Sequence, residues 1–226
     1  MTLRELAALI DHTALKPEAT LDQIEQLCRE ALAHVFATVC IHPVFVSEAS
    51  RLLDGSSVKV CTVVGFPLGA STSAVKGFET REALRLGARE IDMVVWVGGV
   101  KSGRWDWVEE DVAEVARICR DEGAVLKVIL ECALLTDEEK RQACGVCVRA
   151  GAHFVKTSTG FGPGGATVED VRLMADAVKA KGLGVKAAGG IRSYADLLRM
   201  VDAGATRIGT SSGVKIMDEA RAAGLN

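Results

Sequence analysis

The chain has 226 residues, of which 49% are hydrophobic and 25% charged, and its formal net charge at pH 7 is −3. These values are ordinary for a globular protein with a sizeable core. Acidic and basic residues are scattered, so the basic stripe that a nucleic-acid-binding protein needs is missing. No apolar run approaches the roughly 20 residues that cross a bilayer. We therefore expect neither a nucleic acid nor a membrane as a partner.

The N-terminus and the cysteines bear on the compartment. The chain begins Met-Thr-Leu-Arg-Glu, which lacks the charged start and apolar middle of a secretory signal. Its seven cysteines have no framework spacing. Cys144 and Cys147 match a redox spacing, but they lie in a helical stretch with no second pair to complete a zinc site. These features predict a reduced, cytoplasmic protein whose cysteines pack in the core.

Hydroxyl residues mark the predicted helix starts in chain order. In a capping box, a Ser or Thr side chain and an acid or amide three residues on satisfy free backbone N–H groups. The first such pair predicts a short helix at the N-terminus. The matching positions are Thr2 with Glu5, Thr20 with Gln23, and Thr136 with Glu139, and we also expect N-caps at Thr167 and Ser193.

A second unit recurs: an amphipathic helix, a Gly-Ala pair and then a short apolar strand. Glycine suits a helix C-terminus because the left-handed cap conformation costs it little. Strands this apolar, alternating with helices, are typical of a parallel sheet covered by helices. The expected strands are Leu9–His12, Phe36–Cys40, Val58–Val64, Ile91–Val95, Leu126–Leu130, Phe154–Lys156, Val185–Ala187 and Arg207–Gly209.

Eight such units favour a closed (β/α)₈ barrel, the TIM barrel, over an open doubly wound sheet. No linker or charge block suggests a second domain, so we expect residues 1–226 to form one barrel domain. The active site of such barrels lies at the carboxyl ends of the strands.

Charged residues occur in the predicted strands at positions that alternation turns toward the barrel axis. In strand four, Ile91, Met93 and Val95 should face the helices, and Asp92 should therefore face the axis. Lys156 ends strand six and Lys186 lies in strand seven. A buried ion-pair network is the alternative explanation, since buried charges must be paired. Their convergence at the functional end favours catalysis. Lys127 and Glu131 share a face of strand five and are candidates to point inward too.

Two lysines on adjacent strands suggest a specific chemistry. Strands lie about 4.8 Å apart, so the two ammonium groups could approach to roughly 5–6 Å. At an effective dielectric of about 20, their repulsion is about 3 kcal/mol. That would bring the pKa of one lysine from about 10.4 towards about 8. A lysine that is neutral near physiological pH attacks a carbonyl and forms an imine, the Schiff base.

Glycine-rich segments follow the last three predicted strands. Gly160 lies in the loop after strand six, Gly189-Gly190 after strand seven and Ser211-Ser212 after strand eight. The loops after strands seven and eight are the usual phosphate site of this fold. Backbone N–H groups at glycines and helix N-termini bind anions. We expect a phosphate group there rather than simple tight turns.

Several blocks together resemble deoxyribose-phosphate aldolase, from about Ile10 to Ser212. They are Ile10-Asp11-His12-Thr13-Ala14-Leu15, Glu90-Ile91-Asp92-Met93-Val94, Leu126–Glu131, Lys156-Thr157-Ser158-Thr159-Gly160 and Lys186-Ala187-Ala188-Gly189-Gly190-Ile191-Arg192. The resemblance implies a class I aldolase, without cofactor or metal, that reversibly cleaves 2-deoxy-D-ribose 5-phosphate to acetaldehyde and D-glyceraldehyde 3-phosphate. It also implies a role in deoxyribose phosphate catabolism and a homodimer or homotetramer.

The resemblance assigns roles to individual residues. Lys156 matches the Schiff-base lysine, Lys186 the lysine that perturbs it, and Asp92 the acid that transfers protons with a water. Phosphate and substrate contacts fall on Thr159, Gly160, Gly189, Gly190, Ser211, Ser212, Asp11 and Thr13.

The chain also departs from the family pattern. Some members have a lysine where this chain has Phe161, and some end in a tyrosine that assists proton transfer, whereas this chain ends in Asn226. Trp96 and Gly98-Gly99 after strand four are not typical either. Two other functions stay open: a phosphosugar epimerase or isomerase, and a non-catalytic sugar-phosphate-binding barrel.

Overall fold

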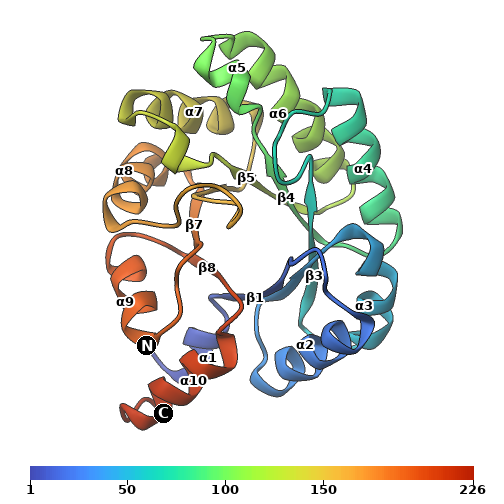
Figure 1. Cartoon of the computed structure of the whole chain (residues 1–226), viewed down its shortest axis with the longest axis vertical. Coiled ribbons are helices and arrows are strands. Elements are labelled where there is room, and N and C mark those ends of the chain that lie inside the picture. Colours follow the sequence, from blue (N-terminus) through green and yellow to red (C-terminus); the bar gives the residue numbers. More distant parts are fainter.

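A computed structural model describes residues 1–226. Eight parallel strands form a closed barrel in chain order, with β8 pairing back to β1. Helices ring the barrel, and the helices of successive units lie side by side around it (Figure 1). The strands are β1 (Ile10–Ala14), β2 (Thr38–Ile41), β3 (Lys59–Val64), β4 (Glu90–Val94), β5 (Val125–Ile129), β6 (Phe154–Lys156), β7 (Gly184–Ala188) and β8 (Arg207–Thr210).

Ten α-helices and three short 3₁₀ helices connect the strands. The α-helices are α1 (Leu3–Ala7), α2 (Leu21–His34), α3 (Val46–Leu52), α4 (Ser73–Arg85), α5 (Val97–Lys101), α6 (Trp105–Asp121), α7 (Asp137–Ala150), α8 (Val168–Val178), α9 (Tyr194–Asp202) and α10 (Gly213–Ala222). The 3₁₀ helices are η1 (Pro43–Phe45), η2 (Cys132–Leu134) and η3 (Lys179–Lys181).

The predicted barrel is confirmed, and the differences lie in the ends of the strands. The strand expected over Leu9–His12 runs from Ile10 to Ala14, and the one expected over Phe36–Cys40 runs from Thr38 to Ile41. Both strands extend toward the site because Thr13 pairs with Cys40, and Ala14 with Ile41. Apolar runs show where a strand lies, but pairing with its neighbours decides where it ends.

The predicted helix starts are also confirmed. Complete capping boxes are present at Thr2, Thr20, Thr136 and Ser193, and the Thr167 hydroxyl accepts a hydrogen bond from the Asp170 N–H. A further N-cap, Thr72 at the start of α4, was not predicted. No acid or amide follows it three residues later to complete the pattern.

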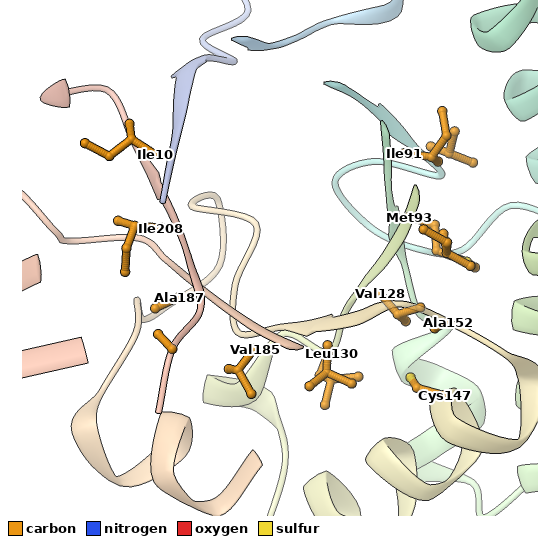
Figure 2. Packing of buried hydrophobic residues seen from close by; sticks show 14 of the residues in the cluster. Ile10, Ile91, Met93, Val128, Leu130, Cys147, Ala152, Val185, Ala187 and Ile208 are labelled. Carbon is orange, nitrogen blue, oxygen red and sulfur yellow. The ribbon is translucent and has the colours of Figure 1, made fainter. Parts of the chain in front are cut away.

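The main hydrophobic core lies between the barrel wall and the helices. Ile91 and Met93 belong to this core, and Figure 2 shows both side chains on the same side of β4. Asp92 between them is fully buried on the opposite side. The predicted alternation in β4 is therefore correct, and it leaves the barrel interior for polar side chains.

The two ends of the chain meet beside the barrel. The Leu3 N–H donates a hydrogen bond of 3.0 Å to the Asn226 carbonyl, and α1 lies next to α10 (Figure 1). No helix has the length and apolar character that crossing a membrane requires.

Candidate active site

A cluster of ionisable side chains fills the barrel interior. Asp11 comes from β1, Asp92 from β4, Lys127 from β5, Lys156 from β6 and Lys186 from β7. Barrel closure brings these strands around one axis, so β4 reaches residues on β6 and β7 that are not its sheet neighbours. Asp11, Asp92, Lys127 and Lys186 have no exposed surface, and the Lys156 side chain is 3% exposed.

Asp92 is the centre of this cluster. Its Oδ2 accepts hydrogen bonds of 2.7 Å from both Lys156 Nζ and Lys186 Nζ, so at most about 5.4 Å separates the two nitrogens. Its Oδ1 accepts a 3.0 Å bond from Lys127 Nζ. The close pair of lysines agrees with the expected spacing, but a carboxylate lies between them. The sequence pattern placed Asp92 on the axis without showing that it bridges the two lysines.

A second layer of charges closes the lower end of the interior. Lys127 Nζ lies 2.5 Å from Glu90 Oε2, and Arg207 donates to Asp11 Oδ1 at 2.7 Å and to Glu90 Oε2 at 2.9 Å. Asp11 also pairs with Lys186. The interior therefore holds four basic groups and three carboxylates. One amine can lose its proton while every carboxylate keeps a cationic partner.

These contacts set the protonation states of the cluster. Burial would raise the pKa of Asp92, but the ammonium groups of Lys127, Lys156 and Lys186 outweigh it and lower this pKa well below its usual range. Burial would lower the pKa of Lys186, but the carboxylates of Asp11 and Asp92 raise it above its usual value. Lys186 therefore stays protonated and keeps its positive charge beside Lys156.

One cavity opens onto this cluster. It has a volume of about 440 Å³, and Lys156 lines it while Lys127 and Lys186 do not. Its wall also includes Thr13, Thr159, Gly160, Phe161, Gly189, Gly190, Arg192 and Ser211. Of the three lysines in this cluster, Lys156 is thus the one that a bound molecule can reach.

The glycines of the cavity wall adopt a backbone conformation that disfavours other residues. Gly160, Gly189 and Gly190 have φ values of 87°, 90° and 83°. The loop after β6 packs tightly on the loop after β7, since a Cβ on Gly165 would lie 2.4 Å from the Gly189 carbonyl oxygen. The Ala166 N–H donates to that same oxygen at 3.0 Å. These contacts hold the two glycine loops together on one side of the cavity.

Glu131 holds the Thr159 end of that loop. It has a φ of 56°, which turns it out of the line of β5, and its carboxylate accepts hydrogen bonds from the Thr159 N–H and hydroxyl. The Thr159 hydroxyl oxygen in turn accepts a bond of 3.0 Å from the Phe161 N–H. The expectation that Glu131 points into the barrel beside Lys127 was therefore wrong, because its left-handed backbone directs it to the loop instead.

Two of the predicted contact residues do not line the cavity. Thr13 and Ser211 line the cavity, whereas Asp11 lies beneath it in the charged cluster. Ser212 is not part of the cavity wall, and its N–H donates to the Thr210 hydroxyl at 2.9 Å. Spacing could not separate these neighbours, because the turn after β8 points only one of the two serines inward.

Other residues of the site were not singled out from the sequence. Lys16 and Gln23 line the cavity beside Arg192, and a basic residue just past the end of the first strand was the available signal. Cys61 donates to Asp92 Oδ1 at 3.2 Å. Cys61 and Asp92 could bind a metal ion with Cys40, but Lys127 Nζ already lies 3.0 Å from Asp92 Oδ1 and 3.4 Å from Cys61 Sγ.

Comparison with known proteins gives the family of the chain. The model of the DeoC/LacD family of aldolases matches residues 6–219. A deoxyribose-phosphate aldolase of Clostridium kluyveri is 57% identical over 97% of this chain and 100% of its own length. One from Caldanaerobacter subterraneus is 54% identical over 99% of this chain and 97% of its own. The tetrameric structure of the enzyme from Aeropyrum pernix superposes with a TM-score of 0.92 at 38% identity, covering 98% of this chain and 93% of that one.

The fold and the buried lysine cluster define an enzyme of the aldolase class, a carbon–carbon lyase on a (β/α)₈ barrel. The chain belongs to the DeoC/LacD aldolase family, as the resemblance of its motifs had implied.

Proposed function

We propose that this enzyme reversibly cleaves 2-deoxy-D-ribose 5-phosphate to acetaldehyde and D-glyceraldehyde 3-phosphate through a Schiff base on Lys156, and that it serves deoxyribose phosphate catabolism. The observation that carries the proposal is the access of Lys156. It lines the cavity while its Nζ lies 2.7 Å from Asp92 Oδ2, which also contacts Lys186. A reachable amine beside a carboxylate and a lasting cation suits imine formation.

The reaction follows from these positions. Neutral Lys156 Nζ attacks the C1 carbonyl of the open-chain sugar, and loss of water gives an iminium ion. When the C3 hydroxyl loses its proton, C3 becomes the aldehyde carbon of D-glyceraldehyde 3-phosphate, which leaves as the C2–C3 bond breaks. The electron pair of that bond forms an enamine, so the iminium acts as the electron sink. Protonation of C2 and hydrolysis then release acetaldehyde and the free lysine. Asp92, with a water, transfers the protons because it contacts Nζ directly.

The substrate's phosphate would bind at the other end of the cavity. Gly160, Gly189, Gly190 and Ser211 line the cavity, and so do the basic residues Lys16 and Arg192. Backbone N–H groups at positive-φ glycines are suited to contact anion oxygens. Asp11 and Ser212 would support this arrangement from outside the wall rather than touch the sugar.

Borohydride trapping tests the proposal. Acetaldehyde and borohydride should convert the imine into a stable ethyl group on the Lys156 peptide, detected by mass spectrometry. Lys156→Ala should abolish both turnover and labelling. Lys140, which pairs with Asp137 and Asp170 on the outside of the barrel, supplies a control, since Lys140→Ala should keep both. Labelling of the Lys186 peptide instead would reverse the roles of the two lysines.

The same experiment separates the other candidate functions. An epimerase or isomerase would shift protons without forming an imine, and a sugar-phosphate-binding barrel would have no turnover. Neither would be labelled.

The proposed reaction needs no divalent ion, because the iminium accepts the electrons. Activity should therefore survive prolonged dialysis against EDTA. Activity that is lost on dialysis and restored by zinc or magnesium would move the enzyme to a metal-dependent class.

A further inference from the structure

His12 lies next to the proposed phosphate end of the cavity, on the other side of β1. Along this strand Asp11 faces the barrel interior and Thr13 lines the cavity, so His12 between them faces outward. It is nevertheless buried, with 2% of its surface exposed. Its ring lies beneath the first residue of α10 and against the ring of Phe36, with 5.1 Å between the ring centroids.

Glu30 on α2 holds one nitrogen of this ring. His12 Nε2 lies 2.7 Å from Glu30 Oε2, and Glu30 Oε1 accepts a 2.9 Å bond from Gln26. Burial would raise the pKa of Glu30, but the hydrogen bonds from His12 and Gln26 and the two nearby histidines together outweigh it and lower this pKa. An ionised carboxylate only accepts, so Nε2 donates a proton to it. Glu30 thus determines the orientation of the ring.

The other nitrogen faces the start of α10. His12 Nδ1 is buried and has no hydrogen-bond partner. A Cβ on Gly213, the first residue of α10, would lie 2.8 Å from Nδ1 and 3.1 Å from Phe36 Cζ. The absence of a side chain at Gly213 therefore allows the helix to begin directly on the His12 ring.

The start of α10 directly follows the cavity wall. Ser212 is its N-cap residue, but the Ser212 side chain makes no capping hydrogen bond. Ser211, one residue earlier, lines the cavity together with Gly189 and Gly190. The first N–H groups of a helix have no partner within the helix, and the helix dipole favours an anion beside them. The position of this helix start therefore affects how well it meets a phosphate group.

We infer that His12, oriented by Glu30, is a positioning residue that sets the α10 N-terminus for recognition of the substrate's phosphate. The inference rests on the proposed function. The His12 ring packs under the start of α10, and Gly213 has no side chain that would collide with this ring. The two residues therefore form a single contact. A change on either side shifts the helix start while leaving Asp92 on β4 and the lysines on β5, β6 and β7 in place.

Substitutions on both sides of the contact test this inference. Gly213→Ala places a methyl group against Nδ1, and His12→Ala removes the support. Each should raise KM for 2-deoxyribose 5-phosphate by about tenfold with little change in kcat. KM for unphosphorylated 2-deoxyribose should change by less than about twofold. Because the two residues act through one contact, the double variant should be no worse than the single ones. Glu30→Gln, whose amide oxygen can still accept from Nε2, is the milder variant and should show a smaller change of the same kind.

The controls separate this inference from the proposed function. Wild-type enzyme that is not labelled with acetaldehyde and borohydride would remove the proposed function itself. If the wild-type enzyme is labelled but the variants lose activity equally on both substrates, His12 has only a general structural role. Additive losses in the double variant would also overturn the inference, since they would show two independent contacts. Binding of inorganic phosphate, measured by calorimetry on the folded variants, should weaken in parallel with KM.

Discussion

The site depends on the positive charge of Lys186, although this side chain does not line the cavity. Lys186→Met keeps the side chain's length but leaves Asp11 and Asp92 short of a buried cation. We expect kcat at neutral pH to fall by about 10²-fold or more. The reason is that Lys156 loses the protonated lysine that Asp92 holds beside it. Labelling of Lys156 by acetaldehyde and borohydride at high pH should persist.

Lys186→Met should also reduce the free energy of unfolding. A second variant distinguishes this effect from the effect on kcat. Removing one partner of a buried ion pair costs about 3–5 kcal/mol. Asp11→Asn combined with Lys186→Met removes charges of both signs and should recover part of the unfolding free energy in urea titrations. It should not recover kcat. Recovery of both would mean that Lys186 acts only by supporting the fold.

Phe161 is the residue at which this chain departs from relatives with a lysine. Its ring lines the cavity, is half exposed and meets the ring of Phe66 edge-on, with 5.4 Å between centroids. Phe161→Lys adds a cation near the phosphate end and should lower KM for the phosphorylated substrate by about fivefold at low salt. The gain should fade as salt increases. Phe161→Met, which adds no charge, is the control. An equal gain with both substitutions would point to loss of the ring rather than to the phosphate.

Among the elements, α9 is hydrogen-bonded through its first turn to a residue of the cavity wall, Arg192. Asp196 accepts bonds of 3.1 Å from the N–H groups of Arg192 and Ser193, and its pKa is lowered to about 2, chiefly by the Arg192 backbone bond. A carboxylate with a lowered folded pKa stabilises the protein above its unfolded value of about 3.9, and this stability is lost as the pH falls toward about 2.

Asp196→Asn should therefore reduce the unfolding free energy by about 1 kcal/mol at pH 7, with a smaller difference as the pH drops below about 4. Urea titrations at several pH values measure both. Asp202, exposed at the other end of α9, supplies a control because a negative charge there opposes the helix dipole, and Asp202→Asn should cost nothing. A loss for Asp196→Asn that does not change with pH would contradict the assignment.

For the whole molecule, we predict self-association through α4. Val75 and Phe78 lie on one face of this helix and are 47% and 67% exposed, and Leu68 just before it is 76% exposed. A second copy of the chain that covers this patch would remove these apolar side chains from water. Phe78→Asp should reduce the mass of the assembly in light scattering after gel filtration. Val44→Asp, at an 80% exposed apolar residue on η1, tests whether any surface apolar residue has this effect. A monomeric wild-type chain would contradict the prediction.

The amino-acid sequence by itself determined the barrel, because its information is local. Apolar runs recur eight times along the chain, capping boxes and Gly-Ala pairs mark many of the helix ends between them, and each signal depends on residues a few positions apart. The same alternation turned Asp92, Lys156 and Lys186 toward the axis, and the order of the motif blocks indicated the aldolase family. Strand ends were less accurate because they depend on pairing across the sheet.

Only the tertiary structure decided which of these residues touch. Asp92 bridges lysines on β6 and β7, 64 and 94 residues further along the chain, because barrel closure brings those strands face to face across the axis. Lys156 became the reachable lysine because the cavity ends on β6, whereas Lys186 is covered from all sides. Glu131 turned toward Thr159 because its backbone is left-handed. Direction, access and pairing are properties of packed neighbours, and no spacing along the chain specifies them.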